Sequence, residues 1–302
     1  MFSLPNNVTL IEVGPRDGLQ NEKNQIPTHI KLSFIRALQL AGIEEMEVTS
    51  FVSPKWVPQM ADAADIMQQI KNKGRQIVLT PNAKGIEKAK EAHAKSMAVF
   101  VGVSDTFNQK NINRTTEESV NSLRPLILQL KQEGYFVRAC ISTAFHCPYE
   151  GSIELEKTLD LCRQFSDMNV DELSVADTDG MANPAMSYDL FLALREQFPK
   201  QLLTAHFHDT RKLGLTNIYA ALQAGVDRFD TSAGGLGGCP FAPGATGNVA
   251  TEDVLYLLQS LNIETGLNMN AICQAVEIVE PYLSRPIETA MYQQFKREGH
   301  IC

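Results

Sequence analysis

The chain has 302 residues, of which 44% are hydrophobic and 21% are charged, and its formal net charge is −8. This composition is typical of a globular protein with one large or two small domains, and the negative charge argues against nucleic acid or an anionic membrane surface as a partner, although not against an anionic substrate. The first residues form no signal peptide and no twenty-residue apolar run occurs, so we expect a cytoplasmic protein with no membrane segment.

Short apolar runs alternate with helical patterns along most of the chain. Strands are predicted at 8–13, 43–50, 76–80, 97–103, 135–143, 172–176, 202–208 and 228–231. Helices are predicted after each strand in turn, at 28–41, 61–72, 84–93, 115–133, 153–168, 184–198, 217–224 and 251–261. Two further helical segments, 269–283 and 287–296, follow the last unit.

Eight consecutive strand–helix units predict an α/β protein with a (β/α)₈ barrel, the TIM barrel. A doubly wound open sheet is the alternative, but the first strand is not followed by a Gly-x-Gly-x-x-Gly fingerprint, which weakens a dinucleotide-binding version of it. We find no low-complexity linker. We therefore expect a single catalytic domain over residues 1–302, with the barrel at about 8–262 and a C-terminal helical addition at about 263–302.

Polar residues gather where the predicted strands end. The active site of such a barrel lies at the C-terminal ends of its strands. Buried charges are costly unless they are paired or bound to a metal, so their joint placement at one rim indicates a site, although each alone has a simpler explanation as a turn or packing residue. The residues in question are Arg16, Asp17, Glu47, Thr80, Asn82, Ser142, Thr143, Asp177, Thr178, His206, His208, Asp209 and Asp230.

Two of these residues, His206 and His208, lie two positions apart in a predicted strand. Residues at i and i+2 point to the same face of a strand, about 7 Å apart, so both imidazoles can reach one metal ion. Hydrogen-bonded histidines without a metal are the simpler alternative. With Asp17 and the amide oxygen of Asn248, the set suits Mg²⁺, Mn²⁺ or another octahedral divalent ion. Such an ion beside Arg16 suits a substrate with a hydroxyl and a carbonyl or carboxylate, whose enolate the arginine would stabilise.

The glycine-rich run 234–238 follows the last predicted strand and ends at Cys239. One interpretation is a mobile loop that closes over the substrate, and the other is a backbone nest for phosphate. Cys239 is then either a thiol brought to the site or a small buried residue. The other five cysteines form no Cys-x-x-Cys pair, and we expect most of them to be buried thiols.

Three long motifs closely resemble those of the 3-hydroxy-3-methylglutaryl-CoA (HMG-CoA) lyases, a family of metal-dependent TIM-barrel lyases. They are EVGPRDGLQNE at 12–22, SFVSPKWVPQM at 50–60 and GLGGCPFAPGATGNVATED at 235–253. The resemblance extends over about 8–296. It implies that Asp17, His206, His208 and Asn248 bind Mg²⁺ or Mn²⁺. It also implies that Arg16 stabilises the enolate of acetyl-CoA, that Glu47 and Asp177 order the site, and that Cys239 lies on the active-site loop.

The implied reaction is the retro-Claisen cleavage of an HMG thioester to acetyl-CoA and acetoacetate, as in leucine degradation and ketone body formation. Asp17, His206 and Cys239 are all candidates for the base that takes the hydroxyl proton. The resemblance further implies an acyl-CoA substrate and a homodimer. The alternatives are a lyase for a different branched 3-hydroxyacyl-CoA, a Claisen-condensing acyltransferase and, as a distinct class, a non-catalytic barrel that binds CoA.

The chain departs from the family pattern at two places near the predicted rim. Asp179 stands where the best-known lyases have an apolar residue, and Arg211 and Lys212 replace a Tyr-Gly-Gln type of run. None of these positions is a predicted metal ligand. The departures therefore bear on the choice of acyl group and leave the cleavage chemistry intact.

Overall fold

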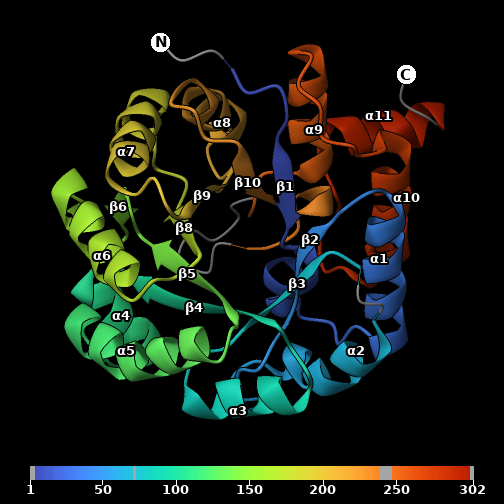
Figure 1. Cartoon of the computed structure of the whole chain (residues 1–302). Helices are drawn as coiled ribbons and strands as arrows, with labels where there is room; N and C mark the ends of the chain where they lie inside the picture. Colours follow the sequence, from blue (N-terminus) through green and yellow to red (C-terminus); the bar gives the residue numbers. More distant parts are fainter. Residues whose placement is uncertain (1–3, 71–72, 239–246, 300–302) are drawn as a thin grey trace.

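The computed structural model describes residues 4–70, 73–238 and 247–299. Eight parallel strands close into a barrel in the order β1-β10-β9-β8-β5-β4-β3-β2, which confirms the predicted fold (Figure 1). The strands are β1 (Thr9–Glu12), β2 (Glu45–Ser50), β3 (Arg75–Leu79), β4 (Ser96–Gly102), β5 (Phe136–Ser142), β8 (Glu172–Asp177), β9 (Leu202–Phe207) and β10 (Arg228–Thr231).

Helices surround the barrel and cover its outer face (Figure 1). Those predicted after the strands are α1 (Thr28–Leu40), α2 (Ala63–Gln69), α3 (Ala83–Glu91), α5 (Thr116–Gln132), α6 (Leu155–Asp167), α7 (Pro184–Gln197), α8 (Gly214–Gln223) and α9 (Thr251–Ser260). Local chemistry explains where they begin. Thr115 and Glu118 form a capping box at the start of α5, and Asn183 accepts a hydrogen bond from the amide of Met186 at the start of α7.

Several short elements were not predicted. Helix α4 (Asp105–Ile112) follows β4, and a small hairpin of β6 (His146–Cys147) and β7 (Gly151–Ser152) follows β5. The 3₁₀ turn η2 (Pro58–Met60) precedes α2, and η3 (Ala233–Gly235) follows β10. Each is too short to show a hydrophobic period, so pattern reasoning assigns these residues to loops.

The C-terminal addition forms α10 (Met269–Val279), the 3₁₀ turn η4 (Glu280–Tyr282) and α11 (Ala290–Glu298). The predicted helix 269–283 ends early because Pro281 cannot donate the helical hydrogen bond. Helix α10 packs against both α1 and α9, and α11 packs against α9 and α10. The addition thus closes the helical layer between the last and the first βα units (Figure 1).

The interior of the barrel holds both an apolar cluster and a set of polar and charged groups. Ile11, Ile77 and Ala98, on β1, β3 and β4, belong to one small buried cluster. On the other strands, β2, β5, β8, β9 and β10, alternate side chains point into the barrel and several of these are polar. These are Glu47, Arg138, Glu172, Ser174, Thr204, His206 and Asp230, of which all but His206 are buried.

No helix in the described ranges is long and apolar enough to cross a membrane.

Candidate active site

Arg16 and Asp17 lie on a single π-helical turn, η1 (Gly14–Gly18), that follows β1 directly. The amides of Arg16, Asp17 and Gly18 all donate to the carbonyl of Val13, at 3.2, 2.7 and 3.2 Å. Such turns are rare and occur often at functional sites. The turn holds a cation and a carboxylate side by side at the C-terminal mouth of the barrel.

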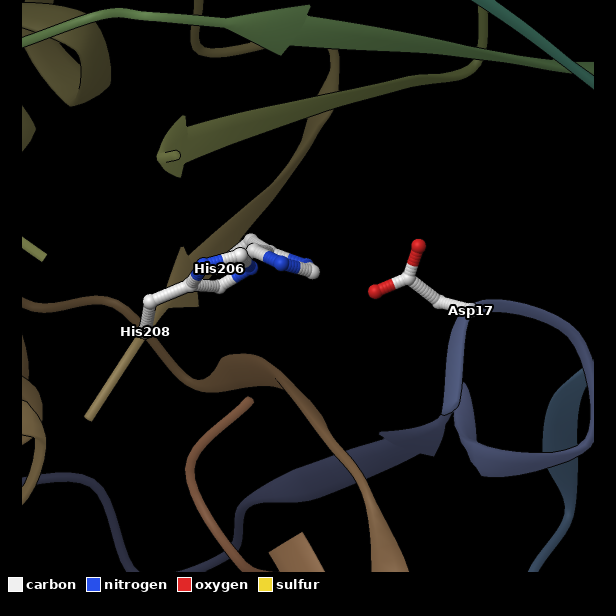
Figure 2. Close-up of side chains that lie close together, drawn as sticks. All are labelled: Asp17, His206 and His208. Atoms are coloured by element: carbon white, nitrogen blue, oxygen red, sulfur yellow. The ribbon is translucent and has the colours of Figure 1, made fainter. Parts of the chain in front are cut away.

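Asp17, His206 and His208 converge across this mouth. Their potential ligand atoms all lie within 4.8 Å of one another, and the two imidazole centroids are 5.2 Å apart. Figure 2 shows the Asp17 carboxylate pointing from the turn after β1 toward the two imidazoles. His206 belongs to β9, and His208 follows its end. The structure therefore brings together three of the four predicted metal ligands.

Asn248, the fourth predicted ligand, contacts this group. Its backbone forms an isolated antiparallel β-bridge with that of His208. Its side-chain Nδ2 donates to Asp17 Oδ2 at 2.8 Å and to the carbonyl of Leu236 at 3.0 Å. Within the described residues, Asn248 Oδ1 and His208 Nδ1 are buried and have no hydrogen-bond partner. Unsatisfied buried acceptors are costly, and imidazole, amide and carboxylate donors suit a hard divalent ion. The residues present therefore fit a bound divalent cation.

The pKa values of the three converging groups are shifted in different directions. Burial would raise the pKa of the Asp17 carboxyl, but Arg16, His206 and the Asn248 amide outweigh it and lower that pKa. Burial, with His206 nearby, lowers the pKa of His208 to about 4. Burial also opposes protonation of His206, but Asp230 reverses the effect and raises its pKa. His208 is thus neutral at pH 7, and Asp17 is ionised.

A chain of alternating charges runs through the barrel from Arg16 to His206. Arg16 donates to Glu47 Oε2 through Nε at 2.6 Å, and Glu47 Oε1 lies 3.7 Å from Arg138 Nη1. Arg138 Nη2 donates to both oxygens of Asp230 at 2.5 Å, and Asp230 Oδ2 lies 3.0 Å from His206 Nδ1. Arg16 Nη1 also donates to Asp17 at 2.6 Å. Two predicted ligands, Asp17 and His206, therefore lie at the two ends of one network.

Arg138 was not among the predicted site residues, and Asp230 was named only as a polar residue of the last strand, without a role. Arg138 interrupts an otherwise apolar strand, which is a signal for a functional or paired charge, but its partner lies 92 residues away in sequence. Burial alone would raise the pKa of Asp230, but Arg138 outweighs it and holds that pKa well below its usual range.

Asp177 ends β8 and accepts hydrogen bonds from the amides of Met181 and Ala182, at 2.9 and 3.1 Å. Burial raises its pKa to about 7, and Asp179 adds to the effect. Asp177 thus holds the loop before α7 through two backbone amides, and its role in ordering the site stays a prediction.

Asp179 pairs with a histidine that sequence reasoning missed. Its Oδ2 lies 2.6 Å from His146 Nδ1 on the β6–β7 hairpin, and within the described ranges its Oδ1 is buried without a hydrogen-bond partner. Arg211 donates to the carbonyls of Asp179 and Gly180 at 2.8 and 3.2 Å, whereas Lys212 points to solvent and pairs with Asp209. Asp179 and Arg211, two of the three residues that depart from the family pattern, are therefore in direct contact.

Two buried glutamates anchor the base of the glycine-rich run. Glu12 accepts hydrogen bonds from the amides of Gly14 and Ala233, at 2.7 and 3.0 Å, and Glu252 accepts one from the amide of Gly234 at 3.0 Å. Burial raises the pKa of each glutamate to about 7. Cys239, the predicted loop cysteine, lies outside the described residues, as does Cys302.

A cavity of about 310 Å³ opens between this base and the C-terminal addition. It is lined by Gly235, Asn248 and Arg285, among others. Arg285 donates to the carbonyls of Gly235 and Gly237 at 3.0 and 2.5 Å. The C-terminal addition therefore contacts the loop next to a predicted ligand.

The chain is similar to known proteins over nearly its whole length. The HMGL-like family profile matches residues 7–279. A hydroxymethylglutaryl-CoA lyase of Bacillus subtilis is 42% identical over 294 residues, which cover 97% of this chain and 98% of that protein. A 3-hydroxy-3-isohexenylglutaryl-CoA/hydroxymethylglutaryl-CoA lyase of Pseudomonas aeruginosa is 44% identical, with 91% of this chain and 92% of that protein covered. An HMG-CoA lyase of Acinetobacter baumannii, solved with coenzyme A and 3-methylmalate, superimposes with a TM-score of 0.90 at 34% identity, over 99% of this chain and 97% of the other.

Proposed function

The chain belongs to the HMGL-like family, and we propose from this premise that it cleaves HMG-CoA to acetyl-CoA and acetoacetate. It is a carbon–carbon lyase. The observation that carries the proposal is the convergence of Asp17, His206 and His208 beside Arg16 in a barrel that matches these lyases from end to end. A condensing acyltransferase and a non-catalytic barrel have no comparable support.

The reaction breaks the bond between C2 and C3 of the acyl chain. A base takes the proton from the C3 hydroxyl, C3 becomes the ketone of acetoacetate, and the electron pair of the broken bond passes to the enolate of acetyl-CoA. A proton then adds to C2 of that enolate. Catalysis therefore requires a base at the hydroxyl and positive charge at the enolate oxygen. The base stays a prediction among Asp17, His206 and Cys239.

The geometry supports a role for each described residue at the mouth. Asp17, His206, His208 and Asn248 would hold a divalent cation, which when bound polarises the substrate oxygens and lowers the hydroxyl pKa. Glu47 holds Arg16 by its Nε, so the guanidinium keeps one orientation. A fixed cation needs no reorganisation as the enolate forms, which is the basis of its effect on rate.

A second candidate function is cleavage of a CoA thioester with a different branched acyl group. The Pseudomonas relative is named for a substrate with a longer apolar branch as well as for the HMG substrate. In this chain Asp179 contacts His146 at 2.6 Å and lies close to Asp177, and the best-known lyases have an apolar residue in place of Asp179. Charged groups disfavour an apolar branch because its approach would strip them of water. We therefore propose HMG-CoA over the longer substrate.

The direct test is acetyl-CoA release from HMG-CoA by EDTA-treated protein, with and without added Mg²⁺ or Mn²⁺. We expect turnover only with metal, and no turnover from His206→Ala under the same conditions. Metal-independent turnover would exclude the proposed site. No turnover by folded, metal-loaded protein would point to a different branched 3-hydroxyacyl-CoA.

Five finer predictions remain proposals. Mg²⁺ and Mn²⁺ both suit the nitrogen and oxygen donors, and the metal-restored rates would rank them. The homodimer is testable by light scattering of the full chain. The cytoplasmic location, the role in leucine degradation and ketone body formation, and the single-domain division rest on sequence reasoning alone.

A further inference from the structure

Asp230 accepts hydrogen bonds from three sides. Arg138 Nη2 donates to both of its oxygens at 2.5 Å, and Ser174 Oγ donates to Oδ2 at 2.9 Å. The third neighbour, His206 Nδ1, lies 3.0 Å from the same Oδ2. The Asp230 side chain is 3% exposed, so water has little access to this contact.

An ionised carboxylate can only accept hydrogen bonds. The contact at 3.0 Å therefore requires the proton of a neutral His206 to lie on Nδ1. Nε2 then carries the lone pair. Histidines that bind metals almost always donate their other ring nitrogen to a carboxylate or carbonyl, which sets both tautomer and ring orientation.

Arg138 keeps Asp230 in place for this contact. Its side chain is fully buried on β5 and reaches Glu47 on one side and Asp230 on the other. Glu47 in turn holds Arg16. The Arg138 guanidinium thus fixes Asp230, which contacts His206, relative to Glu47, which contacts Arg16.

We propose that Asp230 and Arg138 are positioning residues of the metal site: Asp230 holds His206 in the Nδ1-protonated tautomer with Nε2 free to bind the ion, and Arg138 fixes Asp230. The inference rests on the proposed function, because it takes the ion to be the lyase's divalent metal. It assigns a role to two residues that touch neither the ion nor the substrate.

The test is Mn²⁺ affinity of EDTA-stripped protein at one pH, followed by electron paramagnetic resonance. We expect Asp230→Asn to weaken binding by about 10- to 100-fold, the range for partners of metal-binding histidines. Arg138→Lys keeps the charge but loses the planar fork, so we expect a smaller loss. Glu172→Gln is the matched control, because Glu172 lies 3.6 Å from Arg138 Nε and contacts Thr204 rather than His206. Its affinity should stay within about threefold of the unmodified protein.

The His206 tautomer is a second readout that needs no substitution. Imidazole ¹⁵N shifts of the metal-free protein, recorded at a pH high enough for His206 to be neutral, should show a protonated Nδ1 and an unprotonated Nε2. The opposite tautomer, unchanged affinity in Asp230→Asn, or an equal loss in Glu172→Gln would each overturn the inference. Failure of the unmodified protein to bind Mn²⁺ would instead count against the proposed function, and the ¹⁵N measurement would still decide the tautomer.

Discussion

Buried carboxylates occupy two neighbouring regions of the barrel, and their partners differ. In the paired cluster, defined as Arg16, Asp17, Glu47, Arg138 and Asp230, each acid contacts an arginine. In the loop-base pair, defined as Glu12 and Glu252, the acids accept hydrogen bonds from backbone amides and from the hydroxyls of Thr251 and Thr289. Both regions lie near the mouth of the barrel.

The two regions show what decides the charge of a buried acid. Burial raises the pKa in both regions, but in the paired cluster the arginines outweigh it and lower the pKa of Asp17 and Asp230. The neutral hydrogen-bond donors at the loop base do not outweigh the effect of burial, so the pKa values of Glu12 and Glu252 are raised to about 7. Asp17 and Asp230 are therefore ionised at neutral pH, whereas the loop-base pair changes charge near neutrality.

The largest expected effect comes from removing the central cation of the paired cluster. Arg138→Met would leave Asp230 and Glu47 buried without it, and breaking a buried pair costs about 3–5 kcal/mol of unfolding free energy. Chemical denaturation measures the change. The control is Arg163→Met on α6, whose side chain is 46% exposed, with an expected change within about 0.5 kcal/mol. A loss below about 1 kcal/mol for Arg138→Met would mean that the pairing contributes little.

Removing the cation nearest the predicted enolate should affect rate. For Arg16→Ala we expect kcat for HMG-CoA cleavage to fall by about 10²- to 10³-fold, the cost of losing one transition-state donor. Steady-state kinetics with saturating Mn²⁺ measures the loss, and Arg163→Ala should retain full activity. Unchanged kcat in Arg16→Ala would remove Arg16 from the catalytic group.

The loop base should respond to pH in the opposite sense to the paired cluster. Because the folded pKa of Glu12 is about 7 and its ordinary value is 4.5, the folded protein binds the proton more tightly. Its stabilising contribution is complete below pH 4.5 and is lost as the pH rises through 7. Glu12→Gln should therefore gain unfolding free energy relative to the unmodified protein between pH 5 and 8, by up to roughly 3 kcal/mol.

Denaturation at several pH values tests this expectation. Glu87→Gln, on the exposed side of α3, serves as the control and should give a difference that does not change with pH. If Glu12→Gln also behaves in this way, Glu12 remains ionised, and the contrast between the two regions is wrong.

The smallest expected effect concerns the acyl group. Asp179→Val removes the carboxylate and its hydrogen bond with His146, and we expect kcat/KM for 3-hydroxy-3-isohexenylglutaryl-CoA relative to HMG-CoA to rise about tenfold, the scale of a changed apolar contact. Asp189→Val on the exposed face of α7 is the control. An unchanged ratio would place acyl selection elsewhere.

Local patterns were sufficient to predict most of the fold. The alternation of period-2 and helical runs predicted all eight barrel strands and a helix after each of them. The expectation that the active site lies at the C-terminal ends of the strands, together with the His-x-His spacing, predicted that Asp17, His206 and His208 lie close together, as they do in the structure. The C-terminal addition was predicted as two helices, but its packing against α1 depends on closure of the barrel.

The parts that could not be predicted depend on contacts between distant residues. Arg138 meets Asp230 across 92 residues, and His146 meets Asp179 across 33. A single sequence shows that Arg138 interrupts an apolar strand, but it does not show which acid lies opposite. The near-neutral pKa of Glu12 likewise follows from burial by segments as distant as Ala233.

The central claim is that the mouth of the barrel holds one divalent ion that the cleavage needs. The most direct measurement titrates EDTA-stripped protein with Mn²⁺ and follows bound metal and acetyl-CoA release in the same samples. We expect turnover to rise in parallel with occupancy and to saturate at one ion per chain, and His208→Ala to lose both together. Full turnover in the stripped protein, or metal bound at one ion per chain in a variant that lacks both His206 and His208, would contradict the account.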